Sequence, residues 1–193
     1  MRHLKRFALP CLTLLTAATC AAEGPSWASY QQHAMTHEGD PDSGRKIYKD
    51  TVRAKCADCH VAEGNGGLIG PDLSKIGGKF DRVHLIESLL EPSRQIVEGY
   101  QTNQIITVDG IALMGIIRSQ DDDKLVIEDA AGKKTIVPID DIEDQQVSDV
   151  SIMPAELQNN LSEQEFTDLI AYLETLRLGV DDKWGNATRG PIR

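Results

Sequence analysis

The segment CADCH at residues 56–60 constrains this chain more than any other feature of it. Cys56 and Cys59 are three positions apart, so each thiol can form a thioether with one vinyl group of the same porphyrin. His60 follows at once and can place its imidazole beneath the ring as a ligand of the iron. The segment therefore predicts one covalently attached haem c per chain, with Cys56 and Cys59 as the linkages and His60 as the proximal ligand.

Other uses of a CxxC pair fit the chain less well. A thioredoxin-like redox pair lies between a strand and a helix of a βαβ unit, whereas residues 45–55 resemble a helix. A zinc site needs four ligands, and no second cysteine pair follows residue 22. A structural disulfide between Cys56 and Cys59 stays open, although it leaves His60 without a role.

Residues 1–22 have the composition of an export signal, which haem c attachment outside the cytoplasm would require. A positively charged start is followed by an apolar run over residues 7–18 and by small residues at 21 and 22. The apolar run is too short for a comfortable membrane span. We expect cleavage after Ala22 and a periplasmic or otherwise exported protein that has no stable membrane span once the signal is removed.

Cleavage at this point would remove Cys11 and Cys20 and leave only the two cysteines of the CADCH segment. Cys20 could instead carry a lipid anchor, but the bulky Thr19 before it fits a lipoprotein signal poorly. We therefore favour a cleaved signal over a lipoprotein.

The chain is acidic, with a net charge of −10. Residues 1–22 carry three positive and no negative charges, so their removal would leave −13. Such a charge argues against binding to nucleic acid and to anionic membrane surfaces. It would suit docking to a basic patch on a redox partner, and it is equally explained by solubility alone.

Three helices are predicted around the motif. The first begins at Asp40, with Pro41 at its first position, and runs to about Ala54. The second begins at Asp81 and stops at Pro92. The last spans about residues 162–178, where Ser162 and Glu165 can form a capping box and apolar residues recur at helical spacing.

The hydrophobic period changes between residues 101 and 147. Residues 104–108 and 111–118 are rich in β-formers and flank Asp109-Gly110, a strong hairpin turn. Residues 124–128 and 133–139 flank a second turn at Gly132. These patterns predict about four short antiparallel strands. The many acidic residues of this region are interpreted as a solvated face in preference to a docking surface.

A second iron ligand is sought among the methionines and histidines. Met153 lies in a loop before the last helix, and Pro154 holds it in extended geometry that suits a side chain presented from a loop. Met114 is expected to be a packed apolar residue of a strand, and Met35 precedes the first helix. His84 is the best histidine alternative, but it is expected on the second helix. We predict Met153 as the distal ligand.

The order of these features resembles that of class I mono-haem cytochromes c. The Gly-Pro-Asp-Leu segment at residues 70–73 matches the loop of that family. The resemblance implies that the Pro71 carbonyl accepts a hydrogen bond from His60, which would orient the ring and raise its basicity. It also implies that Gly44 and Tyr48 pack against an aromatic residue of the last helix, for which Tyr172 is the candidate.

The strands between the middle helices and Met153 depart from ordinary members. They resemble the haem-binding domain of the Pirellula/Verrucomicrobium type, which matches the Leu-Leu-Glu-Pro-Ser helix end at residues 89–93 and the segments at 99–100, 109–110, 153–154 and 168–173. In that family the domain often accompanies a large periplasmic dehydrogenase-like module. Nothing in this chain implies dehydrogenase activity of its own.

We therefore expect a mainly α cytochrome c fold around one haem, with a small antiparallel β insertion. The expected segments are a signal peptide at 1–22, a leader or linker at 23–40, the haem domain at 41–178 with its insertion at 101–147, and a polar tail at 179–193.

The function expected of such a chain is periplasmic transfer of one electron between redox proteins, candidates being a dehydrogenase and a terminal acceptor, without catalysis of its own. The alternatives are a haem-based sensor or binding module, in which Met153 leaves the iron, and a small electron-transfer subunit of a periplasmic dehydrogenase. A peroxidase-like enzyme is disfavoured, because the sequence offers no obvious distal His/Arg pair.

Overall fold

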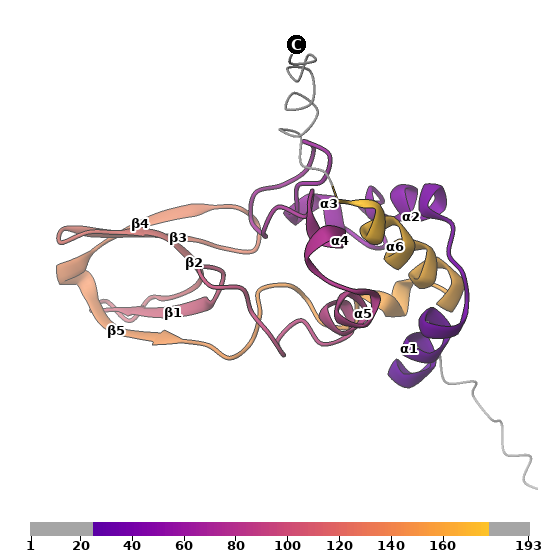
Figure 1. The fold of residues 1–193 in the computed structure, drawn as a ribbon. Coiled ribbons are helices and arrows are strands. Elements are labelled where there is room, and N and C mark those ends of the chain that lie inside the picture. The colour runs from indigo at the N-terminus through magenta and orange to yellow at the C-terminus, as the bar shows by residue number, and fades with distance from the viewer. Residues whose placement is uncertain (1–24, 178–193) are drawn as a thin grey trace, which may run out of the picture.

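A computed structural model describes residues 25–177 as a helical body joined to a β-sheet lobe (Figure 1). The helices are α1 (Trp27–Thr36), α2 (Pro41–Tyr48), α3 (Cys56–Cys59), α4 (Ile76–Lys79), α5 (Arg82–Leu90) and α6 (Glu163–Thr175), with 3-10 turns η1 (Ile139–Asp141) and η2 (Leu157–Asn160). The strands are β1 (Thr102–Thr107), β2 (Ala112–Gln120), β3 (Lys124–Glu128), β4 (Lys134–Pro138) and β5 (Ile142–Val147). Over these residues no helix combines the length and the apolar character that crossing a bilayer requires.

Side chains cap the three predicted helices at the expected residues. Asp40 accepts a hydrogen bond from the Asp42 amide at the start of α2, and Asp81 accepts one from the His84 amide at the start of α5. Ser162 and Glu165 form the predicted capping box of α6. Helix α2 ends at Tyr48, earlier than predicted, because the Asp50 carboxylate accepts bonds from backbone amides of the next turn, which compete with helical ones.

Helix α6 is the centre of the helical body. Its eight consecutive buried residues, 166–173, face α1, α2, α4 and α5 on different sides. Helix α2 approaches it closely at Gly44, where an added Cβ would overlap the Asp168 carbonyl and come within 2.8 Å of the Tyr172 Cβ. One turn later, the rings of Tyr48 and Tyr172 lie 5.4 Å apart, which confirms the predicted packing.

Residues 27–36, expected to be a leader, form helix α1 and belong to the core. Ser26 caps the helix, and Tyr30 and Ala34 are fully buried against α6. The Tyr30 ring meets Phe166 edge-on at 5.5 Å, and its hydroxyl donates to the Leu161 carbonyl at 2.6 Å. The helix was not predicted because Tyr30 and Ala34 are its only buried residues, too few for a clear helical period of apolar side chains.

The β lobe is a five-stranded antiparallel sheet in the order β4-β3-β2-β1-β5. The four predicted strands are present, and β5 is an additional one. Strand β5 reads Ile-Glu-Asp-Gln-Gln-Val and lies at an exposed edge, so it lacks the apolar alternation by which the others were recognised. The described residues are 36% helical, so "mainly α" fits the body rather than the whole chain.

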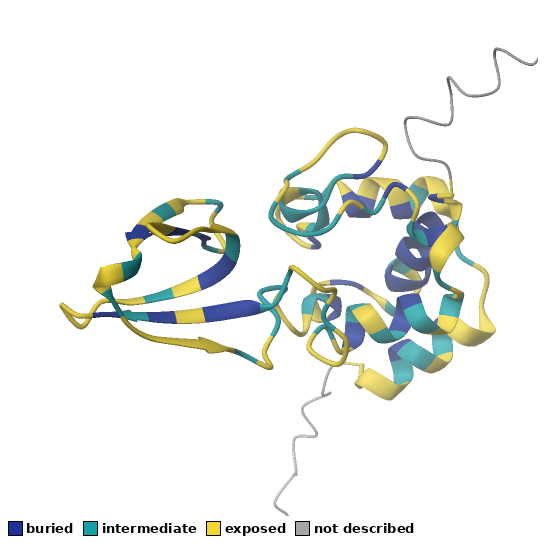
Figure 2. Cartoon of the chain, turned by 60° about the vertical axis from the view of Figure 1, so that its left-hand side comes forward, coloured by how far each residue is buried: buried dark blue, intermediate teal, exposed yellow. Residues whose placement is uncertain are grey.

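The sheet folds over along β2 and encloses a core of its own. Residues 112–116 of β2 pair with β1, residues 116–120 pair with β3, and the register shifts between Ile117 and Ser119. The buried residues of this second core are Ile105, Leu125, Ile127 and Val137. Figure 2 colours the buried stretches of the sheet dark blue.

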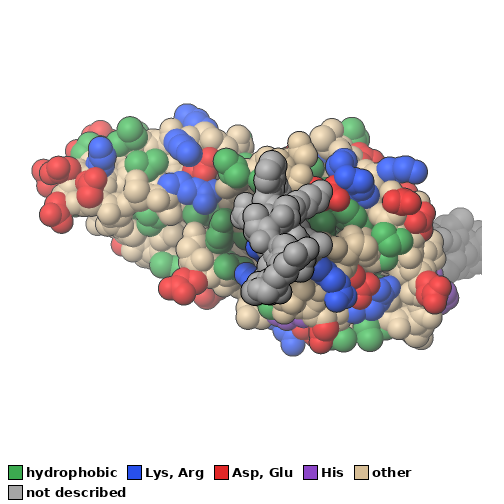
Figure 3. All heavy atoms as spheres, turned by 45° about the horizontal axis from the view of Figure 1, so that its top comes forward, with side chains coloured by type: hydrophobic (Ala, Val, Ile, Leu, Met, Phe, Trp, Pro, Cys, Tyr) green, Lys and Arg blue, Asp and Glu red, His purple; other side chains and the backbone are tan. Residues whose placement is uncertain are grey.

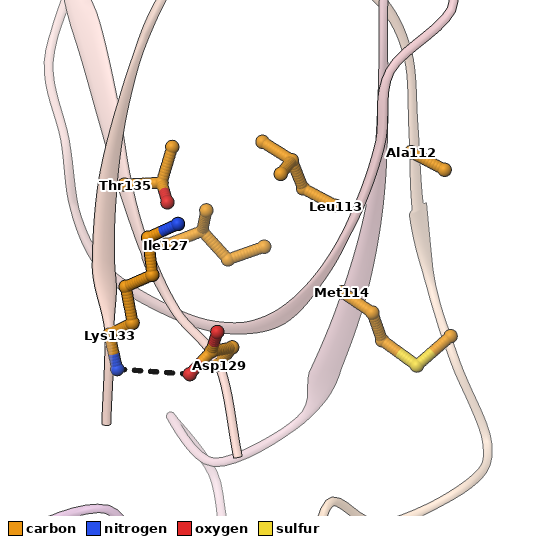
Figure 4. Close-up of a pocket in the computed structure, with 7 residues that line it drawn as sticks. All are labelled: Ala112, Leu113, Met114, Ile127, Asp129, Lys133 and Thr135. Carbon is orange, nitrogen blue, oxygen red and sulfur yellow. Dashed lines mark hydrogen bonds between the residues drawn. The ribbon is translucent and has the colours of Figure 1, made fainter. Parts of the chain in front are cut away.

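A cavity of about 180 Å³ remains beside this core (Figure 4). Leu113, Ile127 and Thr135 point into it, whereas Met114 points away. Met114 is 61% exposed, so the expectation that it is a packed apolar residue was wrong.

Three acidic turns meet at the end of the lobe that is farthest from the helices. The Val108 amide donates to the Asp141 carbonyl, and the Ile139 amide donates to the Asp123 carbonyl, each at 2.9 Å. Figure 3 shows the acidic side chains gathered at this end. The bonds explain how turns that are distant in sequence share one solvent-exposed tip.

Substituting Gly44 by Ala should lower the free energy of unfolding by about 1–3 kcal/mol, because the new methyl group overlaps the α6 backbone. Gly78→Ala is the matched control, since its Cβ would meet nothing closer than 3.6 Å. Chemical denaturation of both variants measures the difference. Equal stability of the two would contradict the close α2–α6 contact.

Candidate haem-binding site

Helix α3 presents the two thiols of the CADCH segment. It is a single turn, and the preceding Lys55 adopts a left-handed conformation with φ 55° that turns the chain into it. Cys56 and Cys59 are both half-buried and free, not joined as a disulfide. Their spacing places both thiols on one side of the turn. Burial raises the pKa of Cys56 to about 12 and raises that of Cys59, so both thiols are protonated at neutral pH.

The ring of His60 is held by the carbonyl of Pro71, with 2.8 Å between Nδ1 and the oxygen. A carbonyl only accepts, so Nδ1 carries the proton and Nε2 keeps its lone pair. Burial lowers the pKa of His60 and outweighs the opposite effect of this bond. The ring therefore stays neutral to lower pH than a free imidazole, which is the form that ligates a metal.

Two close contacts keep the 67–73 loop against the motif. The Gly67 amide donates to the Ala57 carbonyl at 2.9 Å, and the Gly70 amide donates to the Cys59 carbonyl at 2.8 Å. An added Cβ at Gly70 would lie 2.6 Å from the Nδ1 atom of His60, so only glycine permits this approach. The loop thereby brings the Pro71 carbonyl to the ring.

Tyr48 joins the site to the helical body. Its hydroxyl donates to the His60 carbonyl at 2.7 Å, while its ring packs on α6. Burial raises the pKa of Tyr48 far above its usual range, so the hydroxyl remains a donor at any physiological pH.

Met153 lies in a separate loop between β5 and η2. The side chain is half-buried, and its amide donates to the Ser151 hydroxyl at 3.2 Å. The Ser151 amide donates to the Ser93 hydroxyl at 3.0 Å, which ties this loop to the end of α5. Hydrogen bonds thus hold together the segment of Cys56, Cys59 and His60 and the loop of Pro71. The loop of Met153 is held separately, at the end of α5.

The other ligand candidates lie on regular elements. Met35 on α1 is 47% exposed. His84 lies on α5, as expected, half-buried with its ring stacked 4.0 Å from that of Phe80. In the described part of the chain, no three His, Cys, Asp or Glu side chains are grouped to hold a metal ion.

The donor set fits a covalently bound haem. Two free thiols on one side of a turn, and a neutral imidazole whose Nε2 has no hydrogen-bond partner within residues 25–177, are the groups that such a haem uses. Bound in this way, haem would be held by Cys56 and Cys59, with His60 directed to the iron by Pro71.

Arg118 on β2 is a site neighbour that sequence reasoning missed. Its guanidinium donates to the carbonyls of Leu68 and Ile69 and pairs with Glu128 on β3. The only signal was a basic residue at the end of one predicted strand and an acidic residue at the end of another, in two different predicted hairpins. The bulge between Ile117 and Ser119 shifts the register, so the pairing could not be assigned from the sequence.

Comparison with known protein families gives one match. A family model described as Cytochrome c matches residues 41–177, which include α2 to α6 and the whole β lobe. No curated protein matches the chain.

Replacing Tyr48 with Phe should change the absorption spectrum of the bound haem and cost about 1 kcal/mol of stability, because the His60 carbonyl loses its donor. Tyr30→Phe is the matched control: it removes an equivalent bond, to Leu161, away from the site. Absorption spectra and denaturation curves separate the two effects. A spectrum that changes equally in both variants would argue against a specific role of Tyr48.

Proposed function

The chain belongs to the cytochrome c family, and we propose on this basis that it carries single electrons between periplasmic redox proteins through one haem c. Members of the family bind haem covalently and are generally electron carriers. The hydrogen bond between His60 Nδ1 and the Pro71 carbonyl is the main support for the proposal in this chain, because it places the proton on Nδ1 and leaves the lone pair of Nε2 available to ligate iron.

The residues of the chain would have separate tasks in this function. Haem supplies the Fe(III)/Fe(II) couple when it is bound. Cys56 and Cys59 would hold it covalently, and Pro71 would keep His60 in one tautomer and one orientation. Met153 would supply a thioether to the other face, which favours Fe(II) and keeps small molecules from the iron. Its half-buried position in a loop held by Ser93 supports this assignment.

The finer family assignment is to the Pirellula/Verrucomicrobium type of haem domain. The β lobe between α5 and the Met153 loop supports it, because ordinary class I members have little chain there. This type also supports the role of a small electron-transfer subunit that works with a periplasmic dehydrogenase, without catalysis by this chain.

Export to the periplasm is proposed from residues 1–22, which lie outside the described residues, as do 178–193. The composition of this segment supports a cleaved signal. The proposed partners are redox proteins rather than nucleic acid, in keeping with the acidic charge of the chain.

A haem-based sensor is the second candidate. The Met153 loop follows β5 directly and is bonded to β1 through the Ser148 amide and the Thr102 carbonyl. Displacement of Met153 by a gas ligand would therefore reach the β lobe. Ready binding of CO by the unmodified protein would favour this candidate over the carrier.

Replacing both Cys56 and Cys59 with Ala should abolish covalent haem, because no thiol in the exported chain would remain to form a thioether. The measurement is a haem-stained denaturing gel of the exported protein. A stained band in the double variant would refute the assignment.

Met153→Ala should remove the weak near-red sulfur-to-iron band of the oxidised protein and open a site for CO, because the iron loses its distal thioether. Met35→Ala and Met114→Ala are the controls, since both side chains are exposed on other elements. Spectra of the three variants, oxidised and reduced with and without CO, give the result. Persistence of the band in Met153→Ala would exclude Met153 as the ligand.

A further inference from the structure

Arg118 connects the β lobe to the loop that holds His60. One amino group of its guanidinium donates to the Leu68 carbonyl at 3.0 Å and to the Ile69 carbonyl at 2.8 Å. Both carbonyls lie just before Gly70 and Pro71. These bonds join β2 to a segment about fifty residues earlier in the chain.

The peptide unit between Ile69 and Gly70 is held from both sides. Its carbonyl accepts from Arg118, and its N–H donates to the Cys59 carbonyl at 2.8 Å. A peptide unit is planar, so fixing both ends fixes its orientation. The next residue is Pro71, whose carbonyl holds His60 at 2.8 Å. The β lobe is therefore linked to the imidazole through the Ile69 and Pro71 carbonyls, which lie two residues apart in the chain.

Two side chains position Arg118. Its Nε pairs with the Glu128 carboxylate on β3, and Glu128 is buried. The guanidinium carbon also lies 5.7 Å from the centre of the Tyr100 ring. Strands β2 and β3 are close enough at this point that a Cβ on Gly115 would lie 2.7 Å from the Glu128 carbonyl carbon. Arg118 thus projects from a closely packed pair of strands and is paired with a buried carboxylate.

The turn between β3 and β4 adds an apolar contact beside these polar ones. A Cβ built on Gly132 would lie 3.6 Å from the Ile69 Cδ1 atom, so the Ile69 side chain rests against this turn. The backbone of Ile69 is held by Arg118 and its side chain by the turn, both from the same lobe.

We propose that Arg118 is a positioning residue for the iron ligand: it orients the 68–71 loop, and through it the Pro71–His60 hydrogen bond sets the reduction potential. The inference rests on the proposed function, since it assumes that His60 ligates haem iron. A firm bond to Nδ1 increases electron donation by the imidazole, which stabilises Fe(III). Loosening the loop should therefore raise the potential.

The test must distinguish the loss of the Arg118 charge from the loss of the hydrogen bonds that its guanidinium makes. Removing Arg118 alone would leave Glu128 buried and unpaired, which would itself change the potential. Arg118→Lys keeps the charge but loses the planar fork that reaches both carbonyls and the carboxylate. The double variant Arg118→Gln/Glu128→Gln removes both charges together. Arg94→Lys is the control, because Arg94 likewise forms ion pairs, with Glu87 and Glu91, but at the end of α5 and without a contact to the 68–71 loop in the described residues.

The experiment measures hydrogen exchange at the Gly70 amide and the reduction potential of the haem-loaded full chain. In Arg118→Lys and in the double variant, exchange at Gly70 should rise about tenfold or more relative to that at Ile170 in α6, because charge-assisted bonds that hold the loop are lost. The potential should shift upward in both variants and stay unchanged in Arg94→Lys.

The other outcomes overturn the inference in different ways. A rise at Gly70 no larger than that at Ile170 would indicate general destabilisation and exclude local positioning. Unchanged Gly70 exchange or an unchanged potential in both variants, with haem attached, would refute the role of Arg118 and leave the carrier function standing. Absence of covalent haem from the unmodified protein would instead refute the proposed function, and this inference with it.

Discussion

The hydrogen bond from His60 Nδ1 to the Pro71 carbonyl is the contact on which the arrangement of the site depends. It selects one tautomer, leaves Nε2 with its lone pair and fixes the plane of the ring. The bond can form only because Gly70 lets the loop pass directly against the imidazole. Burial also favours the neutral ring, because it lowers the pKa of His60.

The helical body supports this contact through Tyr48. The ring of Tyr48 packs on Tyr172 in α6, and its hydroxyl donates to the backbone of His60. The close approach of α2 and α6 at Gly44 makes both contacts possible at once. A site built on such packed helices is held more precisely than one built on loops alone, which suits a cofactor whose ligand must not move between oxidation states.

The β lobe has a core of its own and two chemically different ends. Towards the helices, Arg118, which is paired with Glu128, donates to the Leu68 and Ile69 carbonyls of the 68–71 loop. At the opposite end, backbone bonds gather the acidic turns into one exposed tip. The folding of the sheet along β2 produces this division, because it returns β3 and β4 to the loop while β1 and β5 lead back to the Met153 segment.

Features that depend on neighbours in the chain could be predicted from the sequence alone. The CADCH segment indicates its cofactor because thioether spacing is local, and caps such as Asp40 and Ser162 begin helices through bonds that span two or three residues. Tertiary structure decided what local chemistry leaves open. Helix α1 is stable because Tyr30 and Ala34 pack against α6. Segment β5 is a strand because β1 pairs with it, not because of its own side chains. The pairing of Arg118 with distant carbonyls required the register of a bulged strand, and register is a property of two strands together.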